Sequence, residues 1–136
     1  MSRWTCPRCD REFGKANQSH VCVPGNSVER TFAQRPHQRE IYDAIIAHLR
    51  TLGPVHEDAV KVGVFLLHER KLAEVRPMAR ALSLELFLPR PLDSPRVTRQ
   101  QRISAERTWL TIRLTEAAQV DGELCDWLAE AYFSAA

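Results

Sequence analysis

The stretch Leu82-Ser83-Leu84-Glu85-Leu86-Phe87-Leu88 places a leucine at every second position. Successive side chains of a β-strand point to opposite faces, so these leucines share one face of a strand. The stretch Thr108-Trp109-Leu110-Thr111-Ile112-Arg113-Leu114-Thr115 repeats the pattern. Clean alternation is typical of antiparallel strands that rest one face on a hydrophobic core. The two stretches therefore predict the centre of an antiparallel sheet.

Weaker strand signals lie on either side of Leu82–Leu88. Residues 60–67 alternate valine and leucine with lysine, glycine and phenylalanine, which predicts one strand with two apolar faces. Residues 72–78 predict a weaker strand at an edge or a bulge, because proline cannot donate a ladder hydrogen bond. Residues 89–96 contain three prolines and predict a loop, followed by a short strand near residues 102–104. The region 55–115 is thus expected to hold four to five strands.

Two amphipathic helices frame this region. The first is predicted over residues 36–52, since Pro36 suits a first helical turn and Gly53-Pro54 ends the helix. The second is predicted over residues 121–134. Each helix carries apolar residues at three- and four-residue spacing on one face: Ile41, Ile45, Leu49 and Leu52 in the first, Leu124, Leu128 and Ala131 in the second. Helices on one face of an antiparallel sheet make a two-layer α+β domain, here residues 27–136.

A cysteine-rich segment precedes this domain. Cys6-Pro7-Arg8-Cys9 is followed by ten residues and then by His20-Val21-Cys22. Three thiolates and one imidazole complete a tetrahedral Zn²⁺ site with no open position, so the metal is expected to be structural. Residues 1–26 are too few to bury a core, and a zinc knuckle this small depends on its metal. A redox Cys-x-x-Cys pair normally opens a helix after a strand, and residues 1–5 are too short for that setting. A disulfide would leave His20 and one cysteine unexplained.

Composition favours a cytosolic protein. The chain has 136 residues, 44% of them hydrophobic, and a net charge of +2. No apolar run approaches the roughly 20 residues of a membrane span, and the start lacks a secretory signal. Residues 1–113 carry a net charge of +7 (19 Lys and Arg against 12 Asp and Glu), whereas residues 114–136 carry −5. This asymmetry indicates either an acidic helix face or an anionic partner for the basic part. No heptad run indicates an oligomeric state.

The sheet face opposite the leucines is a candidate contact surface. If the leucines face the helices, their neighbours point to the other side. That face mixes aromatic and charged side chains suited to a ligand or a partner, unless a loop or the knuckle folds over it. The residues expected there are Lys61, Phe65, Ser83, Glu85, Phe87, Trp109, Thr111 and Arg113.

Nearly the whole chain, from about residue 4 to residue 133, also resembles a known family. Trp4-Thr5-Cys6-Pro7-Arg8-Cys9 and Asn17-Gln18-Ser19-His20-Val21-Cys22 are similar to a zinc knuckle that precedes a small bacterial domain of unknown function, family 5655. The segments after Gly53-Pro54-Val55 and the close at Ala129-Glu130-Ala131-Tyr132 resemble the same domain. The resemblance implies a compact α+β domain, found alone or joined to modules such as nucleases, with no established activity or catalytic residues.

Three functions remain open. The leading hypothesis is a zinc-stabilised, non-enzymatic binding or adaptor protein with a protein partner, because the catalytic motifs of common enzyme classes are absent. The first alternative is association with nucleic acid through the basic knuckle and the arginines of residues 96–102, with binding that weakens as salt rises. The second is a small-molecule or enzymatic pocket near Lys61, Phe65 and Trp109.

Overall fold

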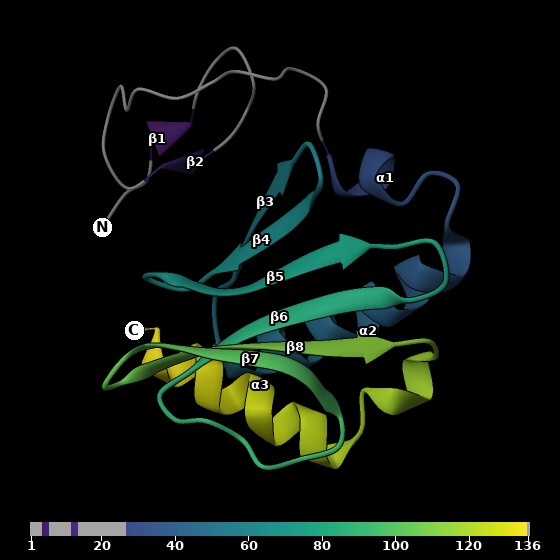
Figure 1. The fold of residues 1–136 in the computed structure, drawn as a ribbon. Helices are drawn as coiled ribbons and strands as arrows, with labels where there is room; N and C mark the ends of the chain where they lie inside the picture. Colours follow the sequence, from purple (N-terminus) through teal and green to yellow (C-terminus); the bar gives the residue numbers. More distant parts are fainter. Residues whose placement is uncertain (1–3, 6–11, 14–26, 136) are drawn as a thin grey trace.

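The computed structural model describes residues 4–5, 12–13 and 27–135. Its elements after residue 26 are a short helix, a long helix, six strands, a 3-10 turn and a final helix (Figure 1). Their bounds are α1 Val28–Thr31, α2 Pro36–Leu52, β3 His56–Val60, β4 Gly63–Leu67, β5 Lys71–Pro77, β6 Leu82–Leu88, β7 Val97–Ser104, β8 Arg107–Leu114, η1 Ala117–Gln119 and α3 Gly122–Ser134. The domain is α+β, as the sequence predicts.

The main sheet is antiparallel throughout and has the strand order β3-β4-β5-β6-β8-β7. It therefore contains six strands within residues 27–135, and the prediction of four to five is wrong. The two alternating stretches, β6 and β8, are neighbours near its centre, with Leu84 opposite Ile112 and Leu86 opposite Leu110.

The additional strand is β3, which forms a hairpin with β4 over residues 56–67, where the sequence predicts one strand over 60–67. Lys61 and Val62 form a two-residue turn between β3 and β4, so these residues are not one strand. Val62 keeps the apolar alternation although its side chain is 52% exposed. Gly63 restarts the ladder, and a Cβ there would overlap the backbone carbonyl of Val75. The turn thus carries an apolar residue where the sequence pattern indicates continued strand.

Strand β7 includes the short segment predicted near residues 102–104 but is far longer. It lies at the edge of the sheet, and all its residues except Val97 are exposed. A strand with neither face buried lacks the alternation that reveals the other strands. The loop before it does contribute to the core, because Leu92 is only 6% exposed.

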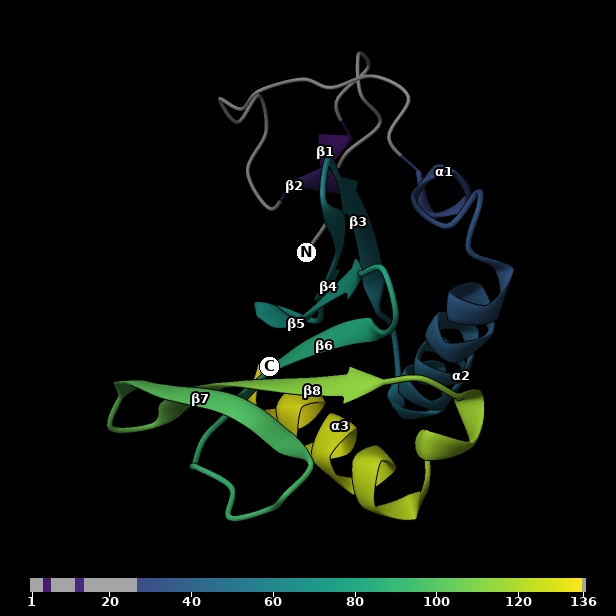
Figure 2. The same cartoon turned by 45° about the vertical axis from the view of Figure 1, so that its right-hand side comes forward.

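Both long helices lie on the same side of the twisted sheet, as the two views agree (Figures 1 and 2). Helix α2 buries Ile41, Ile45 and Leu49, and α3 buries Leu124 and Leu128. These side chains form one core with the inward leucines of β6 and β8. Asp121 caps α3, because its carboxylate accepts a hydrogen bond from the Leu124 amide at 3.0 Å. Among the described residues, no helix is long and apolar enough to cross a membrane.

Candidate functional site on the second face of the sheet

The face of the sheet opposite the helices, called the second face below, carries a row of aligned residues. Backbone pairing places Phe65, Glu74, Glu85 and Thr111 side by side on β4, β5, β6 and β8. Glu74, Glu85 and Thr111 are each less than 10% exposed. Two carboxyl groups and a hydroxyl group thus lie partly out of water at the middle of a sheet, where an unpaired charge is costly.

Two cations compensate the charge of Glu74. The ammonium group of Lys71 donates to one carboxylate oxygen at 3.0 Å, and the Arg76 guanidinium donates to the other at 2.8 Å. Burial alone would raise the pKa of Glu74, but the hydrogen bonds from Arg76 and Lys71 hold that pKa below its ordinary value. Glu74 is therefore an ionised hydrogen-bond acceptor at neutral pH.

Glu85 is in the opposite electrostatic situation. Arg76 lies 3.8 Å from its carboxylate, and the charge of Glu74 lies on the neighbouring strand. Burial, followed by the charge on Glu74, raises the pKa of Glu85 above its ordinary value. Adjacent carboxyl groups whose pKa values are pushed apart can hold and transfer a proton, which is a recurring feature of functional sites.

A β-bulge brings Lys71 into this cluster. The pairing of β4 with β5 shifts register between Leu66 and Leu67, opposite residues 71–73. Leu72 and Ala73 both belong to the core, whereas Lys71 reaches Glu74 on the second face. Bulges commonly redirect a side chain near a site in this way. The Lys71 ammonium also lies 3.9 Å from the ring centre of Phe65 and 5.6 Å from that of Phe87.

The second face brings most of the sequence-predicted residues together. Phe65 and Glu85 lie in the aligned row, and Phe87 pairs with Trp109 in the next row. Arg113 pairs with Ser83 at the far end of β8 and is exposed. Lys61 lies apart from these residues, in the β3–β4 turn, where it lines a pocket of about 260 Å³ with Arg30 and Pro77.

The sequence interpretation missed Lys71, Glu74 and Arg76, whereas it expected Thr111 on this face. Glu74 and Arg76 do have a signal in the alternation across the weaker strand 72–78, where these polar residues interleave with Ala73 and Val75. Thr111 lies one strand over from Glu85, and its Oγ1 atom is buried without a hydrogen-bond partner in the described residues. An orphaned hydroxyl group beside a carboxyl pair is unusual in a native fold.

The family model Domain of unknown function (DUF5655) matches residues 28–135 of the chain. This chain belongs to that family. The match contains every residue of the second face and begins after the predicted zinc knuckle. Searches of curated proteins and of solved structures returned no match.

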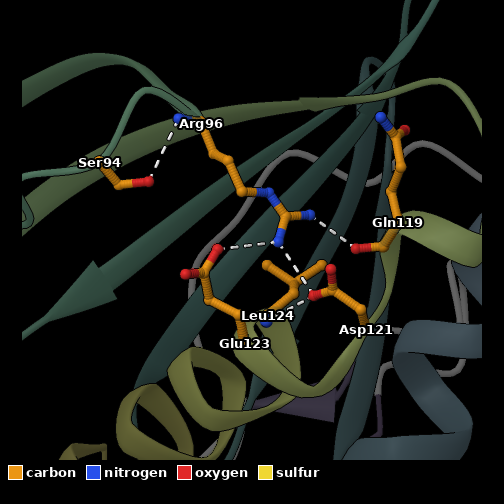
Figure 3. A network of polar contacts seen from close by, with 6 residues as sticks. All are labelled: Ser94, Arg96, Gln119, Asp121, Glu123 and Leu124. Atoms are coloured by element: carbon orange, nitrogen blue, oxygen red, sulfur yellow. Dashed lines mark hydrogen bonds and ion pairs between the residues drawn. The ribbon is translucent and has the colours of Figure 1, made fainter.

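The arginines of residues 96–102 in this family-5655 domain do not form a loop: Arg96 directly precedes β7, and Arg99 and Arg102 lie on that strand. The Arg96 guanidinium donates to Asp121 at 2.9 Å, to Glu123 at 3.2 Å and to the backbone carbonyl of Gln119 at 2.6 Å (Figure 3). Arg99 lies 5.9 Å from the ring centre of Trp109, and Arg102 donates to the carbonyls of its own turn. Arg96 is therefore occupied by α3, and the geometry does not favour it as a phosphate contact.

The predicted zinc ligands Cys6, Cys9, His20 and Cys22 lie outside the described residues. Two short strands flank the first pair: β1 Trp4–Thr5 runs antiparallel to β2 Glu12–Phe13, with Trp4 opposite Phe13 and Thr5 opposite Glu12. The chain between them contains Cys6 and Cys9. Within the part of the chain that the structure describes, no group of three or more potential ligands could hold a metal ion.

Proposed function

We propose that this protein is a zinc-stabilised binding or adaptor protein of the bacterial cytosol, without enzymatic activity, and that the second face is its contact surface. The observation that carries the proposal is the Glu74–Glu85 pair. It lies with Lys71 and Arg76 on the face that neither α2 nor α3 covers (Figure 2). A contribution to stability does not explain this arrangement, because apolar residues of similar volume can commonly replace buried ion pairs without loss of stability.

The aromatic side chains around this pair support the same function. Phe65, Phe87 and Trp109 are half-buried on the second face, so each presents part of its ring to the exterior. Aromatic rings beside fixed charges are the usual composition of contact surfaces, where the rings supply affinity and the charges supply specificity. Trp109 is the residue most suited to a test, since it does not take part in the carboxyl cluster.

The zinc part of the proposal rests on the donor set and on strand pairing. Cys6 and Cys9 lie in the connection between two paired strands, a setting in which two sulfurs can bind one metal ion. His20 and Cys22 would supply the remaining two ligands. With four protein ligands, the bound Zn²⁺ would have no open position for substrate, and its contribution would be to fold the segment.

The experiment is affinity capture with the full zinc-loaded chain, followed by dissociation constants measured with the purified partner. We expect Trp109→Ala to weaken that interaction about tenfold or more, as loss of an interface tryptophan commonly does. Phe133→Ala is the matched control, because Phe133 is an exposed aromatic residue (60% exposed) on helix α3. Equal affinity of Trp109→Ala and the native chain for every captured partner would disprove the second face as the contact surface.

A further inference from the structure

A pocket of about 410 Å³ lies at one end of the second face. It is formed where β5 begins, β6 ends, β7 turns into β8 and α3 finishes. Its volume falls within the range typical of small-molecule sites. The lining residues that matter for its chemistry are Arg70, Lys71, Phe87, Ser104, Glu106 and Arg107.

The pocket has an excess of positive charge, because among the described residues Arg70, Lys71 and Arg107 line it together with a single carboxylate, that of Glu106. Lys71 is compensated by Glu74, as described above. In the described part of the chain, neither Arg70 nor Arg107 pairs with a carboxylate: Arg70 donates to the Ser134 carbonyl at 2.7 Å, and Arg107 donates to the Lys71 carbonyl at 3.1 Å. Burial and then the charge of Arg70 lower the pKa of Arg107. Two guanidinium groups thus repel each other across one pocket, and a bound anion would relieve that repulsion.

Both guanidinium groups are held in place before any ligand arrives. Arg107 stacks on Phe87, with its central carbon 4.3 Å from the ring centre. Arg70 is anchored by Ser134, and its own backbone amide donates to the Ala135 carbonyl at 2.9 Å. Arg70 also has a structural role, since a cation beside the last carbonyls of α3 favours the helix end. That role uses one of its five N–H donors and does not account for Arg107.

The chemistry of the pocket fits a phosphate group. Guanidinium forks match the oxygen spacing of phosphate and lose little entropy when they are already fixed. The Ser104 side chain in the lining adds a hydroxyl donor to the two arginines. We propose that this pocket binds the phosphate group of a small phosphorylated molecule through Arg70 and Arg107. The inference rests on the proposed function, because it names the ligand class for one end of the second face.

Calorimetric titration of the full zinc-loaded chain with inorganic phosphate, at ionic strength held constant with chloride, tests the pocket. We expect saturable binding at one site per chain and a loss of about tenfold or more in Arg107→Gln, since charge-assisted donors dominate such sites. Arg102→Gln is the matched control, because Arg102 is an exposed arginine on β7 outside the lining. Its affinity should stay within about twofold of native.

Titration with adenosine monophosphate distinguishes a phosphorylated small molecule from free phosphate as the natural ligand. Tighter binding of adenosine monophosphate than of inorganic phosphate, with the same loss in Arg107→Gln, identifies a phosphorylated small molecule. Binding of inorganic phosphate alone identifies the free ion and overturns the small-molecule assignment. If Arg107→Gln does not fold, Arg107→Lys keeps the charge and removes the fork, and we expect it to weaken phosphate binding at least about threefold.

Two results would overturn the phosphate site itself. One is the absence of saturable binding up to about 20 mM phosphate, where even weak metabolite sites fill. The other is binding of single-stranded oligonucleotide that Arg102→Gln weakens as much as Arg107→Gln, which would indicate a dispersed polyanion surface. Trp109→Ala separates this inference from the proposed function, because Trp109 does not line the pocket and its loss should leave phosphate binding intact.

Discussion

The hydroxyl oxygen of Tyr132 occupies the place that a Cβ atom on Gly53 would need. Tyr132 is 2% exposed, stacks on His68 at 4.0 Å between ring centres, and donates from its hydroxyl group to the Pro54 carbonyl at 2.9 Å. Gly53 has a φ of 151°, a backbone conformation that residues with a Cβ atom rarely adopt. The end of α2 and the end of α3 are thus locked together at a point where only glycine fits.

Gly53→Ala should therefore destabilise the domain by about 2–4 kcal/mol, from backbone strain together with the overlap on a fixed tyrosine. Urea unfolding measures the change. Gly122→Ala is the matched control, since Gly122 lies in the first turn of α3 and a Cβ there would meet no atom of the described residues within 4 Å. We expect that control to be neutral or slightly stabilising.

A double-mutant cycle separates the two causes. Tyr132→Phe removes the overlapping oxygen atom but leaves the φ of Gly53 unchanged. In that background Gly53→Ala should cost less by about 1 kcal/mol, a coupling energy typical of residues in contact. Equal costs of Gly53→Ala and Gly122→Ala in the native background would contradict the close approach.

The two carboxyl groups of the second face should respond to pH with opposite signs. The folded-state pKa of Glu74 is lowered, so Glu74 contributes stability above its unfolded pKa, and this is lost as pH falls through the folded value. The folded-state pKa of Glu85 is raised, so its favourable contribution exists at low pH and is lost as pH rises through the folded value.

Glu74→Gln should consequently destabilise the protein at pH 7 by about 1–2 kcal/mol, because Lys71 and Arg76 lose a buried partner. Glu85→Gln should be neutral or stabilise by up to about 1 kcal/mol at pH 7, since it removes a carboxylate that burial and Glu74 disfavour. Chemical unfolding at pH 7 and near pH 4 measures both variants. A larger loss of stability at pH 7 in Glu85→Gln than in Glu74→Gln would show that the charge assignment is reversed.

Arg96 should act as a structural residue. Arg96→Ala removes the ion pairs with Asp121 and Glu123 and the hydrogen bond from the guanidinium to the Gln119 carbonyl. We expect the free energy of unfolding to fall by about 1–2 kcal/mol, mostly from that charged hydrogen bond, because the two carboxylates are exposed. Arg90→Ala is the control, because among the described residues Arg90 pairs with Glu130 alone, at 2.9 and 3.0 Å, and its side chain is 56% exposed. Thermal unfolding should separate the two. A loss in Arg90→Ala that equals the loss in Arg96→Ala would show that Arg96 has no special structural role.

The sequence predicts those parts of the fold whose period is tied to burial. Helix α2 occupies the residues that its periodicity indicates, and β6 and β8 pair through the leucine face. The predicted strands differ from the observed ones where hydrophobic period and burial do not coincide. Val62 is apolar but sits in an exposed turn, and β7 is a strand without a buried face.

The candidate site could be predicted only in part for a related reason. Alternation correctly assigns Glu85, Phe87 and Trp109 to the second face. Lys71 escapes the pattern because a bulge changes its side, and the charge pairs of Glu74 depend on strand register that no local pattern determines. The pocket at Arg107 combines β5, β6, the β7–β8 turn and α3, so it exists only in the tertiary structure.

The zinc site is the remaining prediction. Metal analysis of the purified chain should give about one equivalent of Zn²⁺, because three thiolates and one imidazole satisfy a tetrahedral ion. Cys9→Ser should lose most of that metal, since a hydroxyl group is a poor zinc ligand. Cys125→Ser is the matched control: Cys125 lies half-buried on α3, where burial and then the charges of Asp121 and Asp126 raise the pKa of its thiol and disfavour the thiolate that zinc requires. That variant should keep its full zinc content. Equal zinc loss from the two variants, or native protein with well under half an equivalent of Zn²⁺, would disprove the zinc site. The second face would then belong to an α+β domain that needs no metal.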